Sequence, residues 1–309
     1  MLKWTISGSR ARDELRRGIE MYKQIAAALL ILICGTASAE IIEVKGIEID
    51  FVTIGDAGNA ADTSGYGSVS YDYRIGTYEI SNSQWNQFTT AAGVPAGSGA
   101  GYSQDATWEG DNVAANQVSW LEALQFCNYL TSGDRSRGVY KFSDTGEYMG
   151  KESDAAVISG YGTVYALPTE DQWYKAAYYN IASGAYSLYA NGTGTAPTTA
   201  DSCYAADEPW DVGSGTQEQN GTYDMMGSMW EWTETESGDN IIIRGGSYYN
   251  YGNMTTYISS AFSIGVDNYI EQDTIGFRIV EMVPEPMTLI LLGMGGLVIQ
   301  KRSKYKNQK

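Results

Sequence analysis

The chain has 309 residues, and its aromatic content of 12% together with a charged fraction of 18% excludes a disordered acidic segment. Its formal net charge is −17, a sign that disfavours contact with nucleic acid phosphates, so we expect no nucleic acid partner. The sequence contains no histidine, which excludes Ser–His and Cys–His catalysis and histidine-ligated iron or zinc.

The first 39 residues have the pattern of a secretory signal peptide whose translation starts at Met21. A basic start precedes an apolar run over 25–34, and a small-x-small cleavage site ends at Ala39. We therefore predict an exported protein that signal peptidase cleaves after Ala39. A lipoprotein processed at Cys34 is the alternative, although Ile33 stands where a small residue is expected.

Two stretches alternate apolar and polar residues and predict β-strands, over 41–56 and over 71–80. Further along, the same helix-capping pattern occurs three times. The capping pairs are Ser81 and Gln84, Ser119 and Glu122, and Thr169 and Gln172. In each pair the hydroxyl can accept from a free backbone amide while the longer side chain reaches back. Apolar residues follow at helical spacing, so we expect Trp85, Trp120 and Trp173 to pack in the core.

Long stretches rich in Gly, Ser, Thr and Asn lie between these elements, over 90–118, 131–163 and 180–222. They exceed simple connections and are either ordered by packing and bound ions or mobile on the surface. No internal repeat or linker divides them, so we predict one domain over 41–282. Its two cysteines, Cys127 and Cys203, either form a disulfide or occupy separate buried positions.

Residues 283–309 have the features of a C-terminal sorting signal. Pro284, Glu285 and Pro286 precede an apolar stretch over 287–299 and a basic tail. The apolar stretch is short for a full membrane span, and the basic tail fits the cytoplasmic side. A plain anchor helix would show the same pattern, but the order resembles the PEP-CTERM signal. That resemblance implies a short transmembrane helix that anchors the chain transiently, recognition by an exosortase, and transfer to the cell envelope or extracellular matrix.

Six sequence blocks of the central segment resemble the formylglycine-generating enzyme family, also called sulfatase-modifying factors. The blocks are 79–85, 118–123, 167–173, 221–232, 244–248 and 276–278. The most specific are Met-Met-Gly-x-x-Trp-Glu-Trp, ending at Trp232, and Arg-Gly-Gly-Ser, starting at Arg244. The resemblance implies an α+β, C-type-lectin-like fold in a single domain that is irregular and loop-rich.

The same resemblance leads us to expect a loss of the family's catalysis. Family enzymes bind copper through two cysteines shortly after the Gly-Gly-Ser block, and relatives that make ergothioneine bind iron through histidines. In this chain the cysteine positions fall on about Asn250 and Thr255, and no cysteine follows Cys203. Neither side chain forms the thiolate that Cu(I) prefers. We expect no copper or iron and a non-catalytic domain. The alternatives are a formylglycine-generating-type oxidoreductase that modifies a sulfatase or another exported protein, and a carboxylate-based chemistry.

The resemblance also implies a structural calcium site. Its ligands would be the side chains of Asp224 and Glu231 and the carbonyls of Gly227 and Met229, which supply the oxygens that Ca²⁺ requires. Alternatively, Asp224 caps a turn and Glu231 pairs with Arg244. A second site would involve Asp201 and Asp211. Residues 40–286 hold nine basic and 34 acidic residues, which is consistent with calcium binding or with a merely solubilising surface.

The stretch after the Gly-Gly-Ser block is the candidate ligand-binding segment. Its candidate residues are Tyr248, Tyr249, Asn250, Tyr251 and Asn253. Tyr and Asn combine rigid contact area with adaptable hydrogen bonding, as in antibody loops. Variable surface proteins of phage and bacteria that share this fold diversify the same region, although a solvated loop would have the same composition. We therefore predict a binding or structural module whose partner is extracellular polysaccharide or a surface protein.

Overall fold

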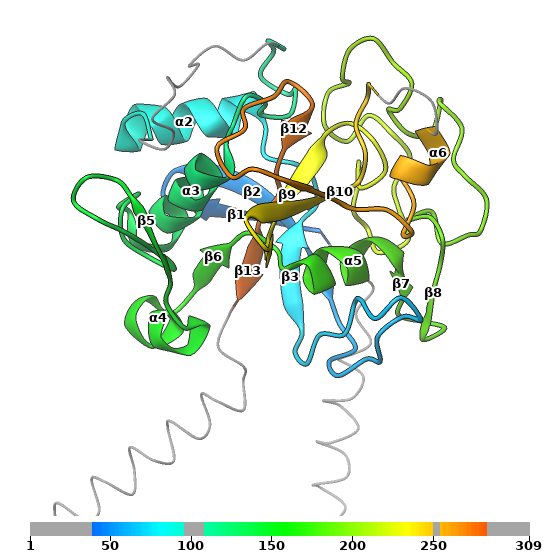
Figure 1. The fold of residues 1–309 in the computed structure, drawn as a ribbon, viewed down its shortest axis with the longest axis horizontal. Coiled ribbons are helices and arrows are strands. Elements are labelled where there is room, and N and C mark those ends of the chain that lie inside the picture. The colour runs from blue at the N-terminus through cyan, green and yellow to red at the C-terminus, as the bar shows by residue number, and fades with distance from the viewer. Residues whose placement is uncertain (1–38, 96–107, 250–253, 283–309) are drawn as a thin grey trace, which may run out of the picture. The chain divides into compact units, whose positions relative to one another are not determined.

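The computed structural model describes residues 39–95, 108–249 and 254–282 (Figure 1). The predicted signal peptide up to Ser38 and the sorting motif Pro284–Pro286 lie outside the described residues, as do Asn250, Tyr251 and Asn253. Within the described ranges, no helix has both the length and the apolar character that a membrane crossing requires.

One five-stranded antiparallel sheet contains the predicted N-terminal strands. Its order is β1 (Glu40–Val44), β2 (Ile47–Ile54), β3 (Tyr73–Gly76), β13 (Val280–Met282) and β6 (Val164–Ala166). The prediction over 41–56 is confirmed as the β1–β2 hairpin, in which buried and more exposed side chains alternate from Ile47 to Phe51. The strand predicted over 71–80 is shorter, because the chain leaves the sheet after Gly76 and Ile80 N donates to Phe277 O at 2.8 Å.

A second sheet is built from the C-terminal half of the domain. Its order is β11 (Ile264–Val266), β10 (Asn240–Arg244), β9 (Trp230–Ser237) and β12 (Ile275–Gly276). The β9–β12 pair is parallel and the other pairs are antiparallel. Two small hairpins complete the strands, β4 (Tyr140–Phe142) with β5 (Tyr148–Lys151) and β7 (Tyr179–Asn180) with β8 (Ala185–Tyr186).

The three predicted helix starts are confirmed. The helices are α2 (Asn82–Ala92), α3 (Trp120–Ser132), α4 (Asp154–Tyr161), α5 (Glu170–Tyr178) and the short α6 (Met254–Tyr257). In α2, Ser81 Oγ accepts from Gln84 N at 3.3 Å while Ser81 N donates to Gln84 Oε1 at 2.8 Å. Ser119 N and Thr169 N donate in the same way to Glu122 and Gln172, both at 2.8 Å.

The hydrophobic core is formed by buried residues of both sheets and of the helices, and the predicted tryptophans are in it. Trp85, Trp120 and Trp173 are all buried, as expected from their helical spacing. Trp85 stacks on Phe126 of α3, and these two helices lie side by side in Figure 1. Cys127 and Cys203 are both buried and free, so the alternative of two separate positions is correct.

The long segment 180–222 is ordered by packing and hydrogen bonds. Asn220 Nδ2 donates to the carbonyls of Ala176 and Tyr179 at 2.8 and 2.7 Å, which fixes the end of this segment against α5. Together with the two sheets and the capped helices, this segment gives the predicted α+β domain with little regular structure.

Candidate functional site

The Glu231 side chain of β9 is completely buried against Arg278, directly after β12. Arg278 Nε donates to Glu231 Oε2 at 2.6 Å and Nη2 donates to Oε1 at 2.7 Å. The remaining guanidinium protons reach the carbonyls of Gly76, Thr77 and Tyr223 at 3.1, 3.2 and 2.8 Å. Trp173 Nε1 adds a hydrogen bond to Glu231 Oε2 at 2.9 Å. This pair therefore joins both sheets and α5 at the centre of the domain.

Three more carboxyl groups surround this ion pair. Glu79 accepts from Ser228 Oγ and Met229 N, both at 3.0 Å, and burial together with nearby Asp224 and Glu231 raises its pKa well above the ordinary value. Burial also raises the pKa of Glu218 to about 8 and that of Asp224 to about 6. Desolvation favours the neutral acid, so around neutral pH Glu218 holds a proton. The charge of the buried Arg278 is therefore offset chiefly by its ion pair with Glu231.

The four predicted calcium ligands lie in and beside this cluster. Asp224 Oδ2 accepts from Gly213 N at 2.6 Å, and Gly227 N donates to Gly245 O at 2.8 Å. Both oxygens of Glu231 already accept from Arg278, so the predicted alternative of a Glu231–Arg244 pair is replaced by a pair with a different arginine. Within the described ranges, no three or more Asp, Glu and Cys side chains are grouped as a metal site. Calcium binding at these residues stays a prediction.

The turn that carries these residues requires its unusual backbone. Asp224 and Ser228 have φ values of 63° and 57°, and Gly227 has a φ of 99°. A Cβ at Gly227 would lie 2.2 Å from the Cys203 carbonyl oxygen, so only glycine fits there. In the second predicted site, Asp201 accepts from Thr198 Oγ1 at 2.6 Å and Asp211 forms a backbone bridge with Val113. Calcium binding there also stays a prediction.

Arg244, the first residue of the Arg-Gly-Gly-Ser block, is buried and bound on every side. Its guanidinium lies 4.9 Å from the ring centres of both Tyr66 and Tyr174, a distance that permits cation–π attraction. It pairs with Glu170 of α5 at 2.7 Å and donates to Phe262 O at 3.0 Å. Arg244 therefore fixes the end of β10 and so sets the starting point of the segment that follows.

That segment begins with an aromatic face, which we define as Trp108, Trp210, Tyr248 and Tyr249. Tyr248 is 2% exposed, and its hydroxyl accepts from Trp108 Nε1 at 2.8 Å with the two rings edge to face. Tyr249 is 44% exposed, and its ring centre lies 6.1 Å from that of Tyr248. Trp108 and Trp210 are half-buried against the small hydrophobic cluster that contains Tyr248. The inner tyrosine thus supports an outer, accessible one.

The two tryptophans of this face were not among the predicted site residues. Each lies in a Gly-, Ser- and Asp-rich stretch without helical periodicity. A tryptophan in such a stretch is not accounted for by the buried face of a helix, and this was the signal that could have identified both. Of the predicted ligand-binding residues, the structure describes Tyr248 and Tyr249 and brings both into the aromatic face.

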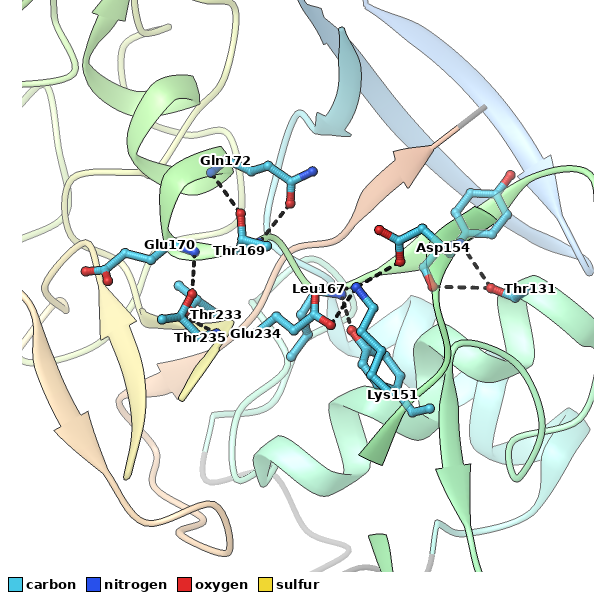
Figure 2. A network of polar contacts seen from close by, with 12 residues as sticks. Thr131, Lys151, Asp154, Leu167, Thr169, Glu170, Gln172, Thr233, Glu234 and Thr235 are labelled. Atoms are coloured by element: carbon cyan, nitrogen blue, oxygen red, sulfur yellow. Dashed lines mark hydrogen bonds and ion pairs between the residues drawn. The ribbon is translucent and has the colours of Figure 1, made fainter. Parts of the chain in front are cut away.

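A separate polar network lies where α4, β5 and β9 meet (Figure 2). Lys151 Nζ is 2.9 Å from Asp154 Oδ1 and 2.8 Å from Glu234 Oε1. Burial raises the pKa of Glu234, and although burial lowers the pKa of Lys151, the Glu234 charge raises it on balance. Next to it Glu170 N donates to Thr235 Oγ1 at 2.9 Å. These contacts hold α5 and the β4–β5 hairpin onto the second sheet.

Comparison with known proteins identifies the relatives of this arrangement. Residues 56–283 match the model of the sulfatase-modifying factor enzyme 1-like domain. Hercynine oxygenase of Mycolicibacterium smegmatis is 28% identical over 210 residues, which cover 57% of this chain and 46% of that enzyme. Hercynine oxygenase of Mycolicibacterium thermoresistibile is 29% identical over 173 residues, covering 53% and 35%. The chain therefore spans less than half the length of these curated relatives.

Solved structures share the fold at low sequence identity. Treponema denticola variable protein 1 superposes with a TM-score of 0.55 at 17% identity, covering 78% of this chain and 98% of that one. CarF gives 0.55 at 20% identity, with 76% and 99% covered. PvdO from Pseudomonas aeruginosa gives 0.54 at 15% identity, with 81% and 99% covered. These likenesses confirm the predicted α+β fold of the formylglycine-generating type.

Proposed function

We propose that this chain uses the fold of its family as an exported binding module without the family's metal chemistry. It belongs to the sulfatase-modifying factor enzyme 1-like family. The observation that carries the proposal is the aromatic face. An exposed tyrosine supported by a buried one follows the Gly-Gly-Ser block, where the family's enzymes have their copper cysteines. Large rigid aromatic surface next to hydrogen-bonding groups favours recognition over catalysis.

The chemistry of the remaining thiols supports the same proposal. Cu(I) binds thiolates, and Asn250 and Thr255 cannot form them. Burial raises the pKa of Cys203 to about 12 and that of Cys127 well above its ordinary value, so both thiols stay protonated at neutral pH. The exported state follows from the predicted signal peptide and PEP-CTERM motif, and places the module in the envelope or matrix after processing by signal peptidase and exosortase.

The ligand that suits this face and this location is extracellular polysaccharide, with a surface protein as the second choice. Tyrosine side chains offer a flat apolar face to a sugar ring and a hydroxyl to its substituents. The carboxyl group of Asp273 interacts with the Tyr248 hydroxyl and provides a further polar group behind the face.

The test is glycan binding by the purified protein, measured by calorimetry with oligosaccharides prepared from the producing cells' own matrix. Tyr249→Ala is expected to weaken binding about tenfold or more, because it removes the accessible ring. Tyr161→Ala is the matched control, since Tyr161 at the end of α4 is 49% exposed, close to the 44% of Tyr249. Equal affinity of both variants and the parent protein would refute the assignment of the aromatic face.

A formylglycine-generating-type oxidoreductase is the second candidate, and the identity to two hercynine oxygenases is the observation that favours it. Copper or iron present in about stoichiometric amount in the purified protein would support this candidate. The same result would overturn the non-catalytic proposal. Metal content measured by mass spectrometry therefore decides between the two.

A further inference from the structure

The more exposed positive charges of this acidic domain lie near the C-terminal end of α3. Residues 40–286 contain only nine Lys and Arg. Five of them have buried or half-buried side chains that contact carboxylates or carbonyls. These five are Arg74, Lys151, Lys175, Arg244 and Arg278. The four that remain, Lys45, Arg135, Arg137 and Lys141, are exposed or half-buried. Lys141 pairs with Glu152 at 2.6 Å, and Arg135 donates to Gly93 O at 3.4 Å.

These four side chains share the C-terminal end of α3. Arg135 and Arg137 follow α3 directly, and Lys141 lies in β4, whose Tyr140 N donates to Asn128 Oδ1 of α3 at 2.9 Å. Lys45 O accepts from Tyr129 of the same helix at 3.2 Å. The C-terminal end of a helix attracts cations through its carbonyls. That effect explains their presence, but not the shape of the surface beside them.

That surface is hollowed into a pocket of about 420 Å³ between residues 134–137 and the β4–β5 hairpin. Arg135 and Arg137 line it, with the hydroxyls of Ser136, Ser143 and Thr145 and the ring of Phe142. Asp134 and Asp144 line it as well. The volume falls in the range of pockets that hold small organic ligands. The Arg137 side chain is 79% exposed and its ion pair with Asp134 is a long contact of 3.6 Å, so its guanidinium is accessible to a ligand.

The pocket therefore offers two cations for an anionic group, and hydroxyls and carboxylates for neutral hydroxyl groups. Guanidinium groups bind carboxylate and sulfate through charge-assisted and often bidentate hydrogen bonds. Asp134 and Asp144 repel a simple inorganic anion, but they can accept hydrogen bonds from sugar hydroxyls. Phe142 supplies apolar surface for the ring. An acidic saccharide satisfies all of these groups together, whereas a bare phosphate or sulfate does not.

We propose that this pocket, the Arg135–Arg137 pocket, binds an acidic saccharide, with the carboxylate or sulfate of the sugar held by the two arginines. The proposal rests on the proposed binding function and specifies its ligand class, at a site separate in sequence from the aromatic face. In a domain with 34 acidic residues, an acidic polymer is repelled by most of the surface. A local cationic pocket gives such a polymer one preferred point of contact and one orientation.

The test uses the full-length purified chain and calorimetric titration with tetragalacturonate at low ionic strength, where exposed charges are least screened. The double variant Arg135→Gln, Arg137→Gln is expected to weaken binding about tenfold or more, because two charge-assisted contacts are lost. The matched control is Lys45→Gln, Lys141→Gln, which removes the same charge from the same end of α3 but from outside the pocket. This control is expected to stay within about threefold of the parent protein.

Several outcomes separate the pocket from its alternatives. A sulfated tetrasaccharide that binds as well as tetragalacturonate identifies the shared anionic chemistry and supports the proposal. Equal loss in both double variants would mean diffuse charge attraction, and equal binding of a neutral tetrasaccharide or of inorganic sulfate would mean that the acidic sugar is not recognised. Each of the last three results, namely equal loss in both double variants, equal binding of a neutral tetrasaccharide and equal binding of inorganic sulfate, overturns the proposal.

Unchanged melting temperatures in both double variants exclude misfolding as the cause of any loss. Tyr249→Ala, measured with the same ligand, distinguishes failure of the aromatic face from failure of the pocket.

Discussion

The buried Arg278–Glu231 pair makes the sharpest stability prediction, for the substitution Glu231→Gln. The variant keeps the shape of the side chain but removes its charge. Arg278 is completely buried and donates five hydrogen bonds, two of them to Glu231. The carbonyls of Gly76, Thr77 and Tyr223 accept the other three but carry no net charge to offset the guanidinium.

The magnitude follows from leaving a buried charge without its partner. Removing one member of a buried ion pair costs about 3–5 kcal/mol. The Gln amide would also point a donor at Arg278 or at Trp173 Nε1, which is itself a donor at 2.9 Å from Glu231 Oε2. We therefore expect the upper part of that range, which is a large share of the stability of a typical domain.

The assay is equilibrium unfolding in urea followed by tryptophan fluorescence. Glu40→Gln serves as the control, because the Arg74–Glu40 contact of 2.8 Å involves a Glu40 side chain that is 67% exposed. Such an exposed pair contributes about 0–1 kcal/mol. A loss below about 1 kcal/mol for Glu231→Gln, equal to that of the control, would refute the argument that this pair is the electrostatic centre of the domain.

Three further predictions concern pH, calcium and the backbone. Burial raises the pKa of Glu122 from 4.5 to about 8, so the folded protein binds this proton more tightly than the unfolded chain. Stability therefore falls as pH rises from about 5 to 8. The variant Glu122→Gln, which keeps a capping side chain, should reduce that fall by about 1 kcal/mol or more, measured by urea unfolding. Chelation by EDTA should lower the melting temperature if the predicted calcium site is occupied, and an unchanged melting temperature together with absence of calcium by mass spectrometry would refute that site. Gly227→Ala should lower the free energy of unfolding by about 2 kcal/mol or more. Gly238 has a φ of 65° but no atom within 4 Å of its Cβ position, so Gly238→Ala should lower it by only about 1 kcal/mol. Equal melting temperatures of the two variants would contradict the clash with Cys203.

Local patterns predicted the helices well because capping is a local interaction. Ser81 with Gln84 and Thr169 with Gln172 form their hydrogen bonds within one turn, so four residues of sequence contain the whole signal. The burial of Trp85 and Trp173 followed from the same helical spacing. The hairpin over 41–56 was equally accessible, because its alternation and its turn are contiguous in the chain.

The candidate site depends on contacts that no short pattern encodes. Trp108 meets Tyr248 across 140 residues, and Arg278 reaches Thr77 across 201 residues. Arg244 was the partner expected for Glu231, whereas the parallel pairing of β12 with β9 brings Arg278 to that position instead. The order of the long segments could not be predicted for the same reason, because Asn220 orders its loop by contacting α5, which lies far earlier in the chain.

The place of β13 in the first sheet has a consequence for the order of events during folding. Val280–Met282 pairs with β3 on one side and with β6 on the other, so the last strand of the domain joins strands that were synthesised much earlier. A chain that emerges in N-to-C order can form the β1–β2 hairpin early, but it cannot close this sheet before residue 282 is available. The first sheet therefore stays open until nearly the whole domain has been made.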